Sequence, residues 1–498
     1  MTSRTATDLP QDAFLCDCKK NMGSACEEEP FYREHEGKRY CVLHYPGTDK
    51  SADFKQALKR KLDREDCNFC GVWFPEPVIF QHFSQRADFR NATFNAEAYF
   101  NSASFNSTAN FSGAGFAGKS VFVDAKFRAD SNFSSTRFKG PVEFYKADFS
   151  AQVFFNKSAF SSGAYFESAE FSGTASFPET VFSDQASFSE ATFNEAADFH
   201  EAKFGGEALF SEAKFNRAAD FQEVKFGAEA SFSEAKFNEA ANFHQARFGG
   251  EASFSGTEFN RGADFREATF GDYARFAPPS AGAGRSDYEP SMDFQNARID
   301  KPERVSFQSM RLRPQWFVNV DARKFEFSNV DWDWKATSIY KEIKDLKLRE
   351  VASPYRMLSI ACRDLADNAE ENHRYEEASS FRFWSMDARR IEKSRGFAFW
   401  RLDWWFWAAS GYGERSIQAL LILIGIWLVF AVLYMRVGFS EAVKPLDTFF
   451  YSLNVILLQK PDPKPVTAWA KALVVLETTM GPLQAALFAL AVRRKFMR

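Results

Sequence analysis

The stretch Phe232-Ser-Glu-Ala-Lys-Phe237-Asn-Glu-Ala-Ala-Asn-Phe243-His-Gln-Ala-Arg-Phe248 carries the pattern that decides the fold. Phenylalanine returns at alternating intervals of five and six residues, and a small residue, usually alanine, stands two positions before most of these phenylalanines. The pattern runs from Phe89 to Phe276 and accounts for much of the surplus of 59 phenylalanines in 498 residues. Self-similarity over this length predicts a stacked repeat architecture.

The spacing favours strands over helices. On a helix, two phenylalanines five residues apart lie about 140° apart, so no single apolar stripe forms. In an extended chain, residues two positions apart face the same side, so the alanine and the phenylalanine of each unit both point inward. We therefore expect a β-solenoid of short extended sides joined by turns. Eight or nine coils stacked at ~4.8 Å would give a rod of roughly 40 Å.

Units such as Ser-Glu-Ala-Lys-Phe237 and His-Gln-Ala-Arg-Phe248 resemble the pentapeptide-repeat family, A-(D/N)-(L/F)-x-x. The resemblance covers roughly residues 69–335 and implies a four-sided right-handed β-solenoid. Every second unit here carries a sixth residue, which lengthens each coil by two residues and suggests a bulge on two sides. We interpret the solenoid as a rigid spacer or as a wall that binds a cytosolic protein partner.

Composition narrows the function. A net charge of -4 is too small and of the wrong sign for a dedicated nucleic-acid binder, so we expect no nucleic-acid partner. We find no phosphate loop, nucleophile triad or dinucleotide fingerprint, so we expect no enzyme and no catalytic residue. Seven cysteines are too few for a disulfide scaffold, and no secretory signal is visible near the N-terminus. We therefore expect the N-terminal region in the reducing cytoplasm.

Cysteines gather before the repeats. Two short pairs separated by a loop suit a tetrahedral zinc ion, and the predicted metal ligands are Cys18, Cys26, Cys41 and His44. Cys16 could replace Cys18 among these ligands. Two alternatives to a zinc site stay open: the thiols are buried without a metal, or they take part in redox chemistry. The ending Tyr40-Cys-Val-Leu-His44 resembles the cysteine-rich N-terminal modules of some pentapeptide-repeat proteins. Structural zinc is the only cofactor that we expect.

Between residues 336 and 395, the apolar residues recur every three or four positions, as in a helix, and no longer alternate as in a strand. Ile339, Ile343 and Leu346 suit one helix, and Pro354 fits the start of another. The helices predicted here resemble a single tetratricopeptide-like hairpin. Since such repeats usually need neighbours to bind peptides, we interpret this segment as a helical adaptor.

Two apolar segments follow near the C-terminus. Ile417–Met435 is nineteen residues without a charge, and Ala472–Val492 carries only Glu477. Both are long enough to cross a bilayer, and a run rich in tryptophan, 397–407, reads as an interfacial belt before the first. Basic residues flank the outer ends of the pair. We therefore expect a multi-pass inner-membrane protein with cytoplasmic N- and C-termini.

The connection between the two segments is apolar but too short to cross. Phe449–Leu458 can only dip into a membrane. Residues 416–498 thus combine two crossing segments with a short segment between them that dips into the membrane. This arrangement resembles the two-transmembrane pore domain of potassium channels. Asp447-Thr-Phe-Phe-Tyr-Ser452 resembles the start of that family's pore helix, and Leu476-Glu-Thr-Thr-Met-Gly481 resembles the inner helix with its hinge glycine. The resemblance implies a homo-oligomer, a tetramer by analogy with that family, around an axial pore.

The resemblance breaks at the selectivity filter. Leu458-Gln-Lys-Pro-Asp462 contains no glycine, so potassium selectivity of the usual kind is not expected. The predicted pore and loop residues are Gln459, Lys460, Pro461, Asp462, Glu477 and Gly481. Glu477 faces either the axis or a neighbouring helix, and Gly411-Tyr-Gly413 is interpreted as a turn at membrane entry.

These patterns predict a chain of several domains and a function for it. The expected function is an oligomeric inner-membrane channel-like protein with a cytosolic repeat sensor or vestibule. The alternative is a membrane-anchored scaffold for protein–protein interaction without conductance. The expected segments are a cysteine-rich module and linker at 1–66, the β-solenoid at 67–335, the helical adaptor at 336–395, the interfacial aromatic segment at 396–415 and the all-α two-span domain at 416–498.

Overall fold

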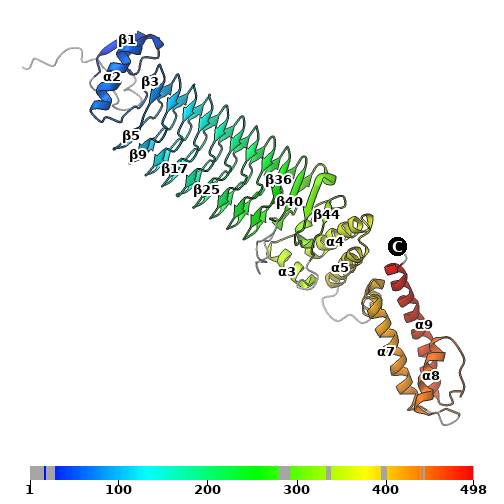
Figure 1. Ribbon diagram of the computed structural model, residues 1–498. Helices are drawn as coiled ribbons and strands as arrows, with labels where there is room; N and C mark the ends of the chain where they lie inside the picture. The colour runs from blue at the N-terminus through cyan, green and yellow to red at the C-terminus, as the bar shows by residue number, and fades with distance from the viewer. Residues whose placement is uncertain are drawn as a thin grey trace, which may run out of the picture. The chain divides into compact units, whose positions relative to one another are not determined.

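The chain forms two compact units (Figure 1). The first comprises Met1–Leu312 and Phe325–Asp331, and the second comprises Arg313–Lys324 and Trp332–Arg498. The first unit is a solenoid of strands with a small N-terminal module, and the second is helical. The computed structural model describes residues 16–17, 29–279, 292–332, 338–393, 401–437, 439–440 and 444–496.

The N-terminal module packs on the first coil of the solenoid. Its elements are β1 (Phe31–His35), β2 (Lys38–Cys41), η1 (Thr48–Lys50) and α2 (Ser51–Asp63). The ring of Phe54 meets that of Phe74 edge to face, with centroids 5.6 Å apart. The amide of Trp73 donates a hydrogen bond of 2.9 Å to the carbonyl of Leu43. The module therefore covers apolar side chains that the first coil would otherwise expose.

Each coil of the solenoid has four very short strands joined by four turns. One central coil consists of β22 (Ala175–Ser176), β23 (Val181–Phe182), β24 (Ala186–Ser187) and β25 (Thr192–Phe193). Equivalent residues of successive coils lie 22 positions apart. They pair in parallel, as Phe182 does with Phe204. The result is four parallel sheets of 9, 10, 11 and 12 strands.

Phenylalanine and alanine fill the interior of the solenoid. Ala103 and Phe105 are both 0% exposed, which confirms that the two residues of a unit point inward. Rings of successive coils stack face to face, as Phe94 and Phe116 do with centroids 4.4 Å apart. Rings of adjacent columns meet edge to face. Burial of each ring contributes about 1.5–3 kcal/mol, so the interior stacks account for much of the driving force for folding.

The sixth residue of the longer units lies in a turn. Residues with positive φ recur every eleven positions, including Glu190 (φ 60°), Glu201 (φ 55°) and Glu212 (φ 59°). They lie at two of the four corners, in the five-residue intervals, as Glu190 does between Phe188 and Phe193. The extra residue of the six-residue intervals falls at the other two corners, as in 194–196, and the pairing register of the strands on either side is unbroken along the sheets. The extra residue therefore lies at a corner between strands and not in a bulge on a side, as was predicted. An extra residue at a corner leaves the ladder of hydrogen bonds intact, whereas a strand bulge would interrupt it.

The solenoid is longer than expected, with about 11 turns instead of eight or nine. The sequence count used only the unbroken phenylalanine pattern, and coils with other residues extend it at both ends. The added strands include β3 (Trp73–Phe74), β4 (Val78–Ile79) and β5 (His82–Phe83) before it, and β41 (Met292–Asp293), β42 (Arg298–Ile299), β43 (Val305–Gln308) and β44 (Glu326–Ser328) after it.

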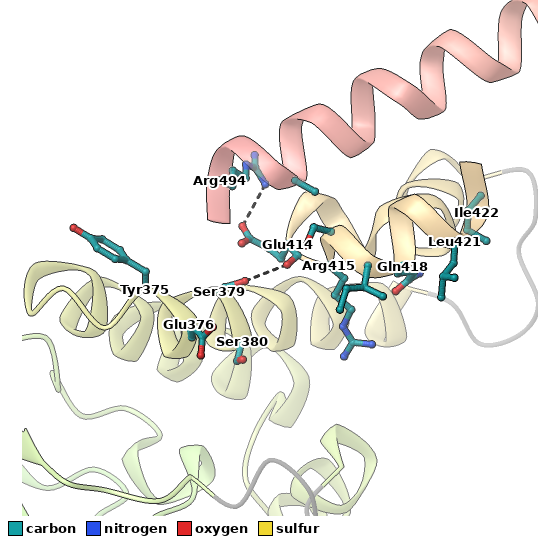
Figure 2. A pocket seen from close by; sticks show the side chains of 13 residues that line it. Tyr375, Glu376, Ser379, Ser380, Glu414, Arg415, Gln418, Leu421, Ile422 and Arg494 are labelled. Carbon is teal, nitrogen blue, oxygen red and sulfur yellow. Dashed lines mark hydrogen bonds and ion pairs between the residues drawn. The ribbon is translucent and has the colours of Figure 1, made fainter. Parts of the chain in front are cut away.

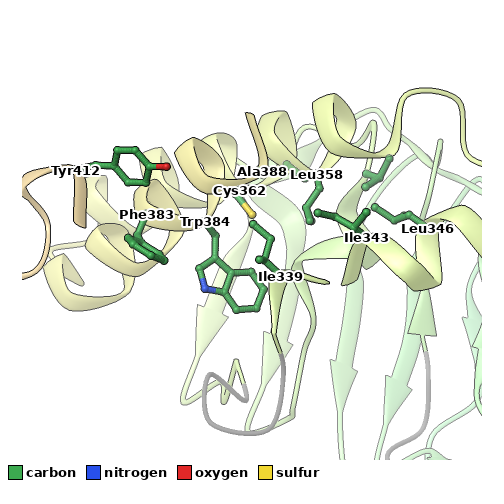
Figure 3. Packing of buried hydrophobic residues seen from close by; sticks show 11 residues of the cluster. Ile339, Ile343, Leu346, Leu358, Cys362, Phe383, Trp384, Ala388 and Tyr412 are labelled. Carbon is green, nitrogen blue, oxygen red and sulfur yellow. The ribbon is translucent and has the colours of Figure 1, made fainter. Parts of the chain in front are cut away.

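The second unit begins with a small helical bundle. Its elements are η3 (Pro314–Phe317), α3 (Ile339–Leu348), α4 (Pro354–Glu371) and α5 (Tyr375–Lys393). Figure 3 shows their shared core, in which Ile343, Leu358 and Trp384 are buried. Arg313 donates a hydrogen bond of 2.8 Å to the buried carboxylate of Glu342. Residues 313–324 thus pack with the helices, whereas the predicted boundary at 335 assigned them to the solenoid.

Five further helical segments follow in the described part of the second unit. They are α6 (Leu402–Ser410), η4 (Gly411–Gly413), α7 (Ser416–Tyr434), α8 (Pro445–Ile456) and α9 (Ala468–Phe496). Helix α7 packs against both α8 and α9 (Figure 1). The segments Ser416–Tyr434 and Ala468–Arg494 are long and apolar enough to cross a membrane, by length and composition. The turn predicted at Gly411-Tyr-Gly413 is present immediately before α7.

Candidate functional site

Helix α8 is half the length needed to cross a bilayer. Its 12 residues span ~18 Å, against ~30 Å for a hydrocarbon core. Pro445 occupies its first turn, where a missing amide hydrogen is tolerated, and Leu458 with φ 61° follows its end. The side chains of Tyr451 and Val455 are buried in a cluster with Phe430 and Tyr434 of α7. The short helix is therefore packed against the long one.

The carboxylate of Glu477 lies where the three helices meet. Glu477 belongs to α9 and is 0% exposed. The hydroxyl of Tyr434 in α7 donates to one carboxylate oxygen at 2.7 Å, and the hydroxyl of Ser452 in α8 donates to the other. A buried carboxylate without such donors would be strongly unfavourable. Of the two orientations expected for Glu477, the single chain thus shows contacts with neighbouring helices.

The partners of Glu477 were not expected from the sequence. Tyr434 and Ser452 lie 43 and 25 residues away from Glu477. Polar side chains inside otherwise apolar segments were the one signal available, because each needs a partner in a membrane. Spacing alone could not pair them.

Gly481 allows α9 to approach the end of α8 closely. A Cβ atom at this position would lie 2.7 Å from Cγ1 of Ile456 and 3.3 Å from its Cα. Pro482 follows within the helix. The glycine predicted as a hinge thus lies at a tight helix contact, next to a proline that removes one hydrogen bond of α9.

The loop after α8 carries the other predicted pore residues. Gln459, Lys460 and Asp462 are exposed, and Pro461 is partly buried. The amide of Gln459 donates to the carbonyl of Asn454 at 2.8 Å, which closes the last turn of α8. The structure therefore brings these four residues together at one end of α8, whereas Glu477 and Gly481 lie inside the helical packing.

A second cluster joins the adaptor to the ends of the long helices. The guanidinium of Arg494 in α9 donates to the carbonyl of Tyr412 at 3.0 Å and pairs with Glu414 at 3.3 Å. The hydroxyl of Ser379 in α5 donates to the carbonyl of Glu414 at 3.3 Å (Figure 2). Burial raises the pKa of Glu414 above its usual range. Three segments of the second unit thus meet at Glu414.

A cavity of about 770 Å³ opens beside this junction (Figure 2). Its wall is polar toward α5, with Ser379 and Ser380, and apolar along α7, with Leu421 and Ile422. The guanidinium of Arg415 lies over the ring of Phe383, 3.8 Å from its centroid. The arrangement ties the start of α7 to the adaptor through side chains as well as through the backbone.

The predicted aromatic belt is partly described. Trp404, Trp405 and Trp407 lie on α6, while Trp400 falls outside the described residues. Trp405 is 52% exposed, and the ring of Trp407 packs under the guanidinium of Arg390 at 4.4 Å. Exposed tryptophan next to a basic residue is typical of a membrane interface.

The cysteine cluster of the N-terminal module contains two of the four predicted ligands, Cys41 and His44. The donor atoms of Cys16, Cys41 and His44 lie within 4.8 Å of one another, and all three residues are buried. Cys18 and Cys26 lie outside the described residues. The structure thus places Cys41 and His44 together as predicted, with Cys16 as the third member.

Comparison with known proteins concerns the solenoid. A family model described as Pentapeptide repeats (9 copies) matches residues 155–203, 199–245 and 232–277. No curated protein and no solved structure matches the chain. The matched residues coincide with central coils of the solenoid, where the alternation of five and six is most regular. Residues 155–277 of the solenoid are therefore similar to pentapeptide repeats.

Proposed function

We propose that this protein is an oligomeric, channel-like protein of the inner membrane with a cytosolic solenoid. One observation carries the proposal: a helix too short to cross a bilayer packs against two helices that are long enough and that also contact each other. An apolar half-length helix is tolerated at membrane depth only where protein or a water-filled path covers its ends. A ring of copies, four by analogy with two-span pore domains, supplies such a path.

The proposed orientation follows the charges. Arg389, Arg390 and Lys393 precede the first long helix, and Arg493 and Arg494 end the second. Basic residues favour the cytoplasmic side, so the solenoid, the adaptor and both termini are cytoplasmic in this proposal. The loop after α8 then lies on the opposite side, at the mouth of the path.

The proposed mechanism is coupling through Glu414. Since Ser379 of the adaptor and Arg494 of α9 both bind this residue, a displacement of α5 acts on the start of α7 and the end of α9 together. A partner that binds the solenoid or adaptor in one arrangement of these helices shifts the equilibrium toward that arrangement.

The proposed path is not a potassium filter. Gln459, Lys460, Pro461 and Asp462 take the place of a glycine-rich filter, and an exposed lysine from each subunit repels cations. The proposal therefore expects a nonselective or anion-preferring conductance.

Single-channel recording of the purified chain in lipid bilayers tests the proposal. Wild type is expected to conduct, and Lys460→Glu to shift the ion preference toward cations. Lys444→Glu is the matched control, because Lys444 is also exposed but precedes α8, away from the loop. Silent bilayers that contain intact oligomers contradict the channel, and equal shifts from both variants contradict the placement of Lys460 at its mouth.

A membrane-anchored scaffold is the second candidate. It is favoured by the contacts of Glu477, which binds Tyr434 and Ser452 within one chain and so needs no neighbouring copy. In that case the helices only tether the solenoid, which binds a partner protein. Recruitment of a solenoid partner to membranes by a chain that is silent in bilayers would select this function.

A further inference from the structure

We infer that Cys16, Cys41 and His44 hold a zinc ion that fixes the N-terminal module onto the solenoid. The inference is independent of the proposed membrane function, since it concerns only the first unit of the chain. Three soft or borderline donors that converge in a buried place are the ligands that zinc prefers in structural sites.

The distances fit a tetrahedral ion. Zinc bonds of ~2.3 Å to sulfur and ~2.0 Å to nitrogen place ligand atoms roughly 3.3–3.8 Å apart. The three donor atoms already lie within 4.8 Å of one another, and Sγ of Cys41 is 3.0 Å from Nδ1 of His44. Small side-chain rotations therefore suffice to reach zinc geometry.

The backbone brings the second and third donors together. The amides of His44 and Tyr45 donate to the carbonyl of Cys41, at 3.2 and 3.0 Å, and form a tight turn directly after β2. The amide of Cys41 lies 3.5 Å from Sγ of Cys16 and points a donor at that sulfur. Amide donors favour the thiolate over the thiol, and the thiolate is the form that binds zinc.

The imidazole of His44 is oriented for metal binding. Its Nε2 lies 3.0 Å from the carbonyl oxygen of Cys70, which can only accept a hydrogen bond. The proton is therefore on Nε2, and the lone pair of Nδ1 faces Cys41. A backbone carbonyl that fixes the far nitrogen of a histidine is the usual support of a zinc ligand.

Charge and burial complete the argument. Two thiolates in a buried cluster need a cation nearby, and a divalent ion balances them. The ammonium of Lys50 donates to the carbonyls of Val42 and Leu43, at 2.7 and 3.0 Å, and holds the same turn. Three donors leave one tetrahedral position, and Cys18 and Cys26, the ligands predicted from spacing, lie outside the described residues.

The consequence is structural. Zinc links the segment of Cys16 to the end of β2, and the hydrogen bond from His44 to Cys70 links this centre to the first coil. Terminal caps protect the apolar ends of repeat proteins. We therefore expect metal removal to loosen the N-terminal module and the first coils before the rest of the solenoid.

Metal analysis of the full-length chain tests the inference. The protein is purified in detergent with a thiol reductant and without chelator, and its zinc is measured by mass spectrometry. The expected result is about one zinc per chain in wild type and a loss of most zinc in Cys16→Ser, Cys41→Ser and His44→Asn. Cys67→Ser is the matched control and is expected to keep its zinc, because Cys67 does not belong to the cluster.

Two further measurements separate metal loss from misfolding. His44→Cys is expected to retain zinc, because a thiolate can take the same position. Cobalt added to the metal-free wild type should give thiolate-to-metal absorption that Cys41→Ser lacks. Absence of bound zinc together with no cobalt absorption, a Cys16–Cys41 disulfide in reduced preparations, or full zinc in Cys16→Ser would each overturn this ligand set.

Discussion

Phenylalanine dominates the solenoid because a flat ring suits a stack with a fixed coil spacing. Phe166 and Phe188 lie parallel with centroids 4.7 Å apart, close to the ~4.8 Å between paired strands. The alanine of each unit is small enough to let the rings of adjacent columns meet edge to face. Side-chain size and strand spacing thus select the same pair of residues in most units.

Glu167 is one of several polar side chains of the solenoid that bury an atom without a hydrogen-bond partner in the described structure. One of its carboxylate oxygens is buried and has no hydrogen-bond partner in the described structure. Burial raises the pKa of this carboxyl above its usual 4.5. A raised pKa means that the folded state binds the proton more tightly. The contribution to stability is therefore present below pH 4.5 and is lost as pH rises through the raised pKa.

Replacement of this carboxyl by an amide should remove that pH dependence. Glu167→Gln is expected to gain stability relative to wild type as the pH is raised from 4 to 7, by less than about 1 kcal/mol because the side chain is partly exposed. Thermal unfolding at several pH values, followed by circular dichroism, measures the difference. Glu212→Gln, at an exposed corner, is the control. A gap between Glu167→Gln and wild type that does not change with pH would refute the interpretation.

The left-handed corners of the coils are the elements in which the backbone is strained. Glu212 adopts φ 59°, a left-handed conformation that costs a residue with a Cβ about 1 kcal/mol relative to glycine. Gly113 and Gly256 occupy equivalent corners in other coils. Glu212→Gly is therefore expected to raise the free energy of unfolding by roughly 0.5–1 kcal/mol.

A glycine two positions later should have the opposite effect. Lys214 lies in strand β29 (Lys214–Phe215), where glycine costs backbone entropy, so Lys214→Gly is expected to lower the free energy of unfolding by roughly 0.5–1 kcal/mol. Urea unfolding of both variants checks the pair. Equal destabilisation by the two glycines would show that the corner conformation carries no strain.

The contact of three helices at Glu477 can be tested by removing the hydrogen-bond acceptor that its carboxylate supplies. Glu477→Ala leaves the hydroxyls of Tyr434 and Ser452 without this acceptor and should destabilise the packing of α7, α8 and α9 by about 1–3 kcal/mol. Glu477→Gln keeps one acceptor oxygen and should cost less. Thermal stability in detergent, followed by size-exclusion chromatography, ranks the variants.

The control for Glu477 is a polar residue on the exposed side of the same helix. Thr479 is exposed and donates to carbonyls of its own helix, so Thr479→Ala should be near neutral. If Glu477→Ala is as stable as Thr479→Ala, the buried carboxylate does not hold the three helices together.

At the scale of the whole molecule, the sequence predicted the solenoid best, because the same local pattern of side chains recurs in its coils. Ala103 and Phe105 point inward because side chains alternate along an extended chain, and every coil repeats that cause. The length of the solenoid was underestimated because coils around Trp73 and Val305 use other residues in the same backbone positions.

The candidate sites depend on contacts that spacing cannot reveal. Cys41 and His44 are three residues apart and were predicted together, whereas Cys16 was an alternative to Cys18 that spacing alone could not place beside them. Glu477 was recognised as unusual, whereas its partners in α7 and α8 were not, because helix packing decides which polar groups meet. The sequence thus showed which residues carry unusual chemistry, but not which distant residues they contact.

The central claim is that the C-terminal helices cross a membrane twice and that α8 enters from the side opposite the solenoid. Labelling of single introduced cysteines with a membrane-impermeant maleimide in intact spheroplasts tests it most directly. Lys460→Cys, in the exposed loop after α8, is expected to react before lysis, whereas Lys344→Cys, exposed on α3, is expected to react only after lysis. Reaction of Lys460→Cys only after lysis, together with Lys344→Cys, would contradict the account.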